Sequence, residues 1–144
     1  NLGDSTMGRL GNYFTIMLMV EHEGDKSSLE KIVKSVGEPL NLDSHLVELK
    51  DGSVQHFEPD IRVSLFTEDR IGVLEDATVP LANAGLNILH LESNLSEDSE
   101  SGTYFIHLEG TLLQGLAPIY KALEKLEEEK GIKSHLIPVN AQVS

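Results

Sequence analysis

The chain contains one sequence pattern twice, and the first copy is shorter than the second. The first copy starts at Asn1-Leu2, passes through a polar segment and continues into an apolar strand at Tyr13-Phe14-Thr15-Ile16. The second starts at Asn87-Ile88 and continues into a strand at Tyr104-Phe105-Ile106-His107. An amphipathic helix pattern follows each strand. A repeat of this kind predicts two structural units built on one plan.

Only the second copy is preceded by a further strand and helix, which the pattern places at Asp60–Gly85. The first copy begins at Asn1, without an initiator methionine. We therefore expect the chain to be an ordered part of a longer tandem-domain protein. The expected domains are a partial first domain at residues 1–52, without its opening strand and helix, and a complete second domain at residues 60–139.

The charge and apolar patterning exclude two classes of partner. Eleven Lys and Arg face 24 Asp and Glu, a formal net charge of −13, whereas binding to nucleic-acid phosphates requires a basic surface. We expect no direct nucleic-acid binding, so that a genetic role would act through a protein partner.

The longest apolar run, Ile16–Val20, is strand-sized and too short to span a bilayer. Without cysteine there is no disulfide or zinc-thiolate site. We expect a cytoplasmic protein and leave open an organellar targeting segment upstream of Asn1.

In the first domain we expect a turn over Gly3–Gly11 and a strand over Asn12–Glu21. An apolar stripe at helical spacing follows, and Gly37 ends that helix. Asp25 and Ser27 are candidate N-caps of this helix. The later elements are a short strand, a turn and a linker, at Leu46–Leu49, Lys50–Gly52 and Ser53–Pro59.

The second domain shows strand and helix periodicity in the order βαββαβ, the α+β ferredoxin-like arrangement with an antiparallel sheet and both helices on one face. Pro80 lies inside the first helix pattern and predicts a kink there. Pro118 falls in the first turn of the second helix, and Gly131 ends it. The strands are expected to begin near Ile61, Asn87, Thr103 and Lys133, with a polar hairpin loop at Ser96–Gly102 and an end at Val139.

Two short motifs carry a family resemblance. The turn Thr67–Leu74 is similar to the Asp-Arg-Pro-Gly-hydrophobic turn of the ACT domain, and Ala84–Ile88 is similar to that family's Gly-x-Asn-Ile segment. Asn1-Leu2 stands at the matching point of the first domain. The chain resembles the tandem ACT proteins of the glycine cleavage system transcriptional repressor family. It departs from the pattern at Ile71, where the family favours Pro, and at Gly3, where a Glu is expected.

The resemblance implies a ligand site, because ACT domains bind small ligands, often amino acids, near the first strand-to-helix turn. A helix start favours a carboxylate, Gly72 permits close backbone approach, and Arg70 can pair with an anion. Asp69 and Asn87 can accept hydrogen bonds from an ammonium group. The implied ligand-binding residues are Glu68, Asp69, Arg70, Ile71, Gly72, Val73, Asn87 and Ile88.

The same residues also have purely structural interpretations. Without any ligand, Thr67 and Asp69 can cap the following helix. Gly72 can be required for close packing of helix on sheet, and Asn87 can satisfy backbone groups where its strand begins. Glu68 and Asp69 place negative charge where a ligand carboxylate would be repelled.

No catalytic constellation stands out, and we expect neither an enzyme nor a cofactor. The six histidines are scattered, although His90 and His107 lie on strands that are expected to pair. These two could face each other as a two-histidine metal site, but no carboxylate is placed to complete it.

The expected function is therefore that of a non-enzymatic regulatory module. It binds a small amino acid and acts through contacts with a regulated protein partner, in transcriptional or metabolic control of amino-acid or glycine metabolism. The alternative is a structural or oligomerisation ACT pair that has lost ligand binding. Because open sheets have edges that are usually paired or covered, we also expect side-by-side packing of the two domains and a homodimer.

Overall fold

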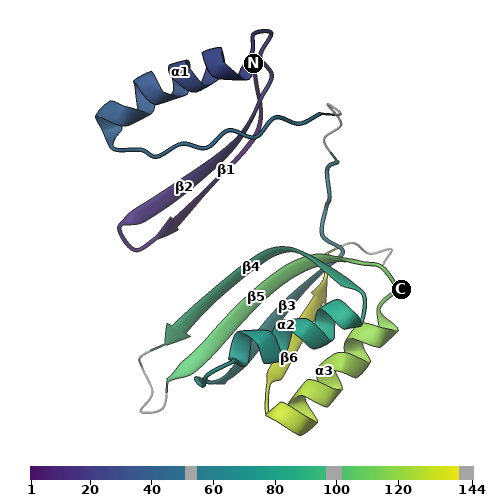
Figure 1. Cartoon of the computed structure of the whole chain (residues 1–144). Coiled ribbons are helices and arrows are strands. Elements are labelled where there is room, and N and C mark those ends of the chain that lie inside the picture. The colour runs from purple at the N-terminus through teal and green to yellow at the C-terminus, as the bar shows by residue number, and fades with distance from the viewer. Residues whose placement is uncertain (51–54, 97–101, 140–144) are drawn as a thin grey trace. The chain divides into compact units, whose positions relative to one another are not determined.

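The computed structural model describes residues 1–50, 55–96 and 102–139 (Figure 1). The chain folds as two units, Asn1–Val54 and Gln55–Ser144.

The first unit begins with a hairpin of two antiparallel strands, β1 (Leu2–Leu10) and β2 (Tyr13–Val20). Its turn contains Gly11 at a φ of 60°. The helix α1 (Lys26–Gly37) follows and runs into the short 3-10 helix η1 (Glu38–Leu40). Asp25 caps α1, because its carboxylate accepts a hydrogen bond of 2.9 Å from the backbone N–H of Ser28.

Two sequence predictions for this unit are wrong. The predicted turn Gly3–Gly11 is mostly strand, because the backbone of β1 pairs along the apolar β2 although its own side chains do not alternate. The predicted strand Leu46–Leu49 has no regular secondary structure. In the second unit the last strand of the sheet pairs with its first strand. The described residues of the first unit contain no equivalent of that first strand with which Leu46–Leu49 could pair.

The hydrophobic side chains of the first unit remain largely exposed. Gly37 is the single fully buried residue among its described residues. Large apolar side chains of β2 and of α1, including Ile16, Leu18 and Ile32, are exposed to solvent. The described residues of this unit therefore form no closed hydrophobic core.

The second unit is a four-stranded antiparallel sheet with two helices, and it confirms the predicted ferredoxin-like fold. The sheet order is β4-β5-β3-β6. Its elements are β3 (Ile61–Glu68), α2 (Val73–Asn83), β4 (Leu86–Ser96), β5 (Thr103–Leu112), α3 (Ala117–Lys130) and β6 (Lys133–Pro138).

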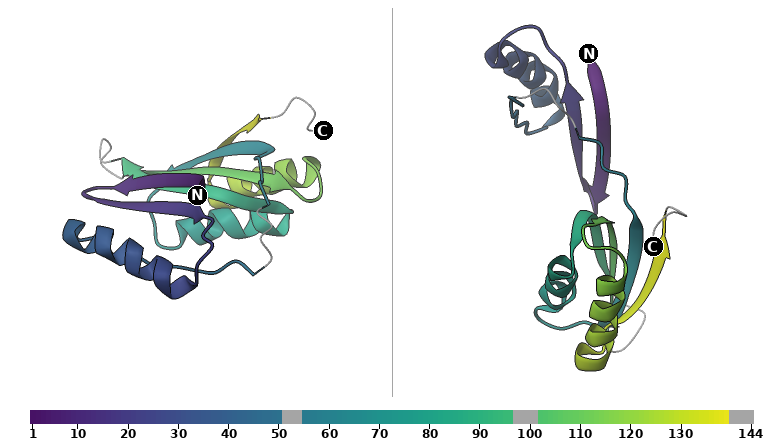
Figure 2. Two further views of the ribbon diagram at one scale, coloured as in Figure 1. Left: turned by 90° about the horizontal axis from the view of Figure 1, so that it is seen from above. Right: turned by 90° about the vertical axis from the view of Figure 1, so that its right-hand side faces the viewer.

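Both helices cover one face of this sheet (Figures 1 and 2). The alternation of β3 sends Ile61, Val63 and Leu65 into the core, and Ile106 and Leu108 of β5 do the same. The helices contribute Ala77, Leu81, Ile119, Leu123 and Leu126. The apolar stripe read from the sequence is therefore the packed face.

The helix ends of the second unit follow their sequence signals. Pro118 lies in the first turn of α3, and Gly131 ends that helix in the left-handed conformation. Pro80 lies inside α2, which continues through it; the kink stays a prediction. None of the helices in the described ranges combines the length and hydropathy that a bilayer crossing requires.

Three predicted connections fall wholly or partly outside the described residues. These are most of the turn Lys50–Gly52, the first part of the linker Ser53–Pro59 and most of the hairpin loop Ser96–Gly102. The described part of the linker, residues 55–59, has no regular secondary structure.

Candidate functional site

Six of the eight predicted site residues lie together where β3 passes into α2. Glu68 ends β3, and Val73 begins α2. Between them Asp69 is held by a backbone hydrogen bond of 3.2 Å, from its N–H to the carbonyl of Gly102. The turn is closed by the N–H of Val73, which donates to the carbonyl of Arg70 at 3.4 Å.

Gly72 has a conformational rather than a packing role. Its φ of 81° lies in the left-handed region, which favours glycine. A Cβ added at this position would meet no heavy atom within 4 Å, so the alternative that Gly72 serves close helix–sheet packing is wrong. The space above the turn is open.

The capping alternative for Thr67 and Asp69 is also wrong. The N-cap of α2 is Gly72, and no side chain forms a cap hydrogen bond at this helix. The first N–H groups of a helix have no partner within the helix. At α2 these groups are therefore not satisfied by a capping side chain.

Arg70 is engaged within the unit. Its Nη2 lies 3.2 Å from a carboxylate oxygen of Asp76, and its Nη1 donates to the carbonyl of Lys130 at 3.5 Å. The Lys130 ammonium lies 4.0 Å from the other oxygen of Asp76. The cation predicted to meet a ligand carboxylate thus already links the turn to both helices.

The remaining turn residues differ in exposure. Ile71 is fully exposed at 103% relative accessibility, whereas Val73 is buried. Glu68 and Asp69 are also exposed. The turn therefore presents one apolar side chain and two carboxylates to solvent.

Asn87 and Ile88 lie at the opposite end of the sheet from the turn. Ile88 shares a row with Gly110 and Ile61, whereas Glu68 pairs with Thr103. Ile61 and Glu68 are seven residues apart on one strand, which separates the two rows by about 23 Å. One amino acid cannot touch both groups within a single domain.

Asn87 and Ile88 both make contacts that belong to the sheet and its core. The Asn87 side-chain amide donates to the hydroxyl of Thr111 at 3.2 Å, and Ile88 packs against the core. Gly110 permits the close approach of β4, because a Cβ there would lie 2.5 Å from the carbonyl oxygen of Asn87.

His90 and His107 do not face each other, so the two-histidine arrangement considered from the sequence does not form. His90 lies opposite Glu109, and His107 lies opposite Glu92. His107 Nδ1 instead lies 3.1 Å from the hydroxyl of Ser64. Within the described part of the chain, no group of three or more His, Asp or Glu residues is placed to hold a metal ion.

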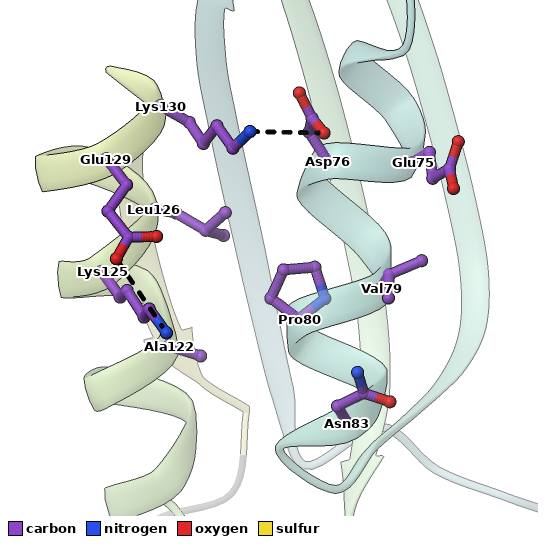
Figure 3. Close-up of a pocket in the computed structure, with 10 residues that line it drawn as sticks. All are labelled: Glu75, Asp76, Val79, Pro80, Asn83, Ala122, Lys125, Leu126, Glu129 and Lys130. Atoms are coloured by element: carbon purple, nitrogen blue, oxygen red, sulfur yellow. Dashed lines mark ion pairs between the residues drawn. The ribbon is translucent and has the colours of Figure 1, made fainter.

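A groove between α2 and α3 was not predicted from the sequence. It encloses about 480 Å³ and has an apolar floor with a charged rim (Figure 3). The rim carries the ion pairs Asp76–Lys130 and Lys125–Glu129, each 4.0 Å long. The lining residues are Glu75, Asp76, Val79, Pro80, Asn83, Ala122, Lys125, Leu126, Glu129 and Lys130. In the sequence, Lys125 and Glu129 show only the i, i+4 spacing of an ion pair on a solvated helix face.

Comparison with known proteins places the second unit in a family. Residues 61–128 match the family model of the ACT domain. The fold of almost the whole chain is similar to that of an unknown protein from Galdieria sulphuraria, with a TM-score of 0.70 at 20% identity over 97% of this chain and 82% of that one.

A second solved structure is described as a candidate glycine cleavage system transcriptional repressor. The chain matches it with a TM-score of 0.70 at 17% identity, over 95% of this chain and 80% of that one. A search of curated protein sequences found no match. At these identities the structural matches show a shared fold. The second unit therefore carries an ACT-domain match, and the fold of the chain resembles that of the structure described as a candidate glycine cleavage system transcriptional repressor.

Proposed function

We propose that the chain is a non-catalytic regulatory module that binds a small amino acid at the turn Glu68–Val73 and acts through contacts with other proteins. The observation that carries this proposal is the form of the turn. Gly72 opens α2 without a capping side chain and leaves free space above it. The ACT-domain match covers the same residues.

The turn offers groups for both ends of an amino acid. The N–H groups and partial positive charge at the start of α2 favour the ligand carboxylate. The exposed carboxylates of Glu68 and Asp69 can accept hydrogen bonds from the ligand ammonium. Arg70 fixes the turn in position rather than contacting the ligand, because Asp76 and the Lys130 carbonyl already hold it.

The proposed physiological role is regulation of amino-acid or glycine metabolism by a cytoplasmic homodimer acting on a protein partner. The fold shared with a candidate glycine cleavage repressor supports this role. The net charge of −13 favours a protein partner over direct contact with nucleic acid. In this proposal residues 1–52 are a partial ACT-like domain and residues 60–139 a complete one.

Three observations favour a second candidate, an ACT pair that has lost its ligand and serves assembly alone. Ile71 exposes an apolar side chain to solvent at the turn. Arg70 is not free to meet an anion. The turn and Ile88 lie about 23 Å apart along the sheet.

A thermal-shift screen of the chain against the common amino acids separates the two candidates. At a ligand concentration of 100 times Kd, binding stabilises the folded state by about 2.7 kcal/mol, which raises the melting temperature by several degrees. Glu68→Gln should then raise Kd about tenfold or more, whereas the matched change Glu124→Gln on the exposed side of α3 should not. If no amino acid shifts the transition, the assembly-only candidate stands.

A further inference from the structure

The groove between α2 and α3 is not used by the amino-acid site proposed above. Its volume of about 480 Å³ lies within the range of about 300–1,000 Å³ that ligand pockets occupy. Side chains of both helices line it (Figure 3). Val79, Pro80, Ala122 and Leu126 supply the apolar part of the lining, and Val79 is 47% exposed. The described residues therefore leave apolar surface uncovered between the two helices.

The free charge around this groove is negative. The helices α2 and α3 together carry six Asp and Glu against three Lys. Lys130 lies 4.0 Å from Asp76, and Lys125 lies 4.0 Å from Glu129. Both lysines of the lining are therefore engaged. Among the described residues, Glu75 at the rim forms no ion pair. A cationic group from outside is attracted to this rim, whereas an anionic group is repelled.

Pro80 adds a hydrogen-bond acceptor to the groove. Proline has no N–H, so the carbonyl of Asp76 lacks the bond that residue 80 would donate in an uninterrupted helix. Residues four apart lie on one face of a helix, which places this carbonyl beside the Pro80 ring in the groove wall. The groove therefore suits an occupant that brings hydrogen-bond donors as well as apolar side chains.

Asp76 also connects the groove to the turn Glu68–Val73. One of its carboxylate oxygens lies 3.2 Å from Nη2 of Arg70 in the turn. The other lies 4.0 Å from the ammonium of Lys130 in the groove lining. A cation that enters the groove from outside therefore reaches the ion pairs that hold the turn.

We propose that this groove binds an amphipathic helix of a protein partner. Its apolar side chains sit between α2 and α3, and its Lys or Arg side chains face the acidic rim. A helix bound in a groove presents apolar anchors at i, i+3, i+4 and i+7. Lys and Arg side chains are donors only, which suits the Asp76 carbonyl and the Glu75 carboxylate. The inference rests on the proposed function, since the partner is the protein through which the module acts.

Fluorescence anisotropy with the whole chain and two labelled synthetic peptides tests the groove. One peptide is an amphipathic helix of Leu and Lys with Leu at i, i+3, i+4 and i+7, and the other has Glu in place of every Lys. We expect the Leu-Lys peptide to bind at least about tenfold more tightly. Equal binding of the two, tighter binding of the Leu-Glu peptide, or no binding of either overturns the proposal. The solution contains no amino acid, so peptide binding without any thermal shift by amino acids would remove the sensing role and keep the groove.

Two matched variants separate the groove from the net charge of the chain. Val79 in the groove and Val36 on α1 are exposed helical valines, at 47% and 62%, and Val79→Lys and Val36→Lys add the same charge. Val79→Lys should raise Kd for the Leu-Lys peptide at least about tenfold, whereas Val36→Lys should leave it unchanged. Circular dichroism confirms that each variant keeps its fold. An equal loss of affinity in both variants, or no loss with Val79→Lys, contradicts the proposal.

Discussion

Arg70 ties the strand-to-helix turn to Asp76, with its Nη2 3.2 Å from the Asp76 carboxylate. The same guanidinium reaches the carbonyl oxygen at the end of α3, at Lys130. One side chain therefore connects the turn to both helices. The position of the turn depends on a cation that the sequence suggested would serve a ligand.

Removing this cation should loosen the turn more than it destabilises the unit. Both partners are partly exposed, and such ion pairs contribute about 1 kcal/mol or less. We expect Arg70→Ala to lower the free energy of unfolding by no more than that, while amide hydrogen exchange accelerates at residues 69–73. The control Arg62→Ala breaks the Arg62–Glu109 pair on the open face of the sheet. Faster exchange of the turn in that variant as well would argue against the positioning role of Arg70.

Two glycines should respond differently to alanine. Gly72→Ala places a side chain in open space and costs about 1–2 kcal/mol for the left-handed backbone alone. Gly110→Ala puts a Cβ 2.5 Å from the Asn87 carbonyl oxygen and 2.8 Å from Leu86 Cδ1, and such overpacking costs about 1–3 kcal/mol or more. Urea unfolding followed by circular dichroism measures both. We expect Gly110→Ala to be the less stable variant, and the reverse order would show that β4 yields easily at this point.

The buried face of β3 should dominate the stability of the second unit. Leu65 is fully buried at 0% exposure, and Leu→Ala changes in cores cost about 2–5 kcal/mol. The same substitution at Leu113, which is 71% exposed, should change the free energy of unfolding by about 0.5 kcal/mol or less. Equal losses in thermal or urea unfolding would contradict the assigned core.

The helix α1 should lose stability in acid. The backbone N–H of Ser28, and then its hydroxyl, hydrogen-bond to Asp25 and hold the pKa of this carboxyl below its usual 3.8. A lowered folded-state pKa stabilises the helix fully above pH 3.8, and the effect is lost as the pH falls through the folded value. Circular dichroism between pH 5 and pH 2 should show this loss. Asp25→Asn keeps a capping oxygen without a titrating group, so its α1 signal should lack this component.

The fold of the second unit could be predicted because its local signals agree with one another. The alternation at Ile61, Val63 and Leu65 and the helical stripe that includes Ala77 and Leu81 each point to the same buried face. The strand β1 was missed because Gly3–Gly8 shows no alternation. Its pairing depends on β2, which lies later in the chain.

The site was only partly predictable for a similar reason. The motif located the turn Glu68–Val73 correctly at the start of a helix. It did not reveal that Arg70 is engaged, because one partner lies six residues away and the other sixty. It also grouped Asn87 with the turn, since sequence motifs carry no information about which end of a sheet a strand begins at.

The separation of the turn from the start of β4 affects how a response would saturate. A ligand that contacts both kinds of residue must sit between two domains, because about 23 Å separates them within one sheet. Where the two domains belong to separate chains, its binding follows mass action in the chain as well as in the ligand. The half-saturating ligand concentration would fall as the protein becomes more abundant, so the sensitivity of the response would be set by expression level.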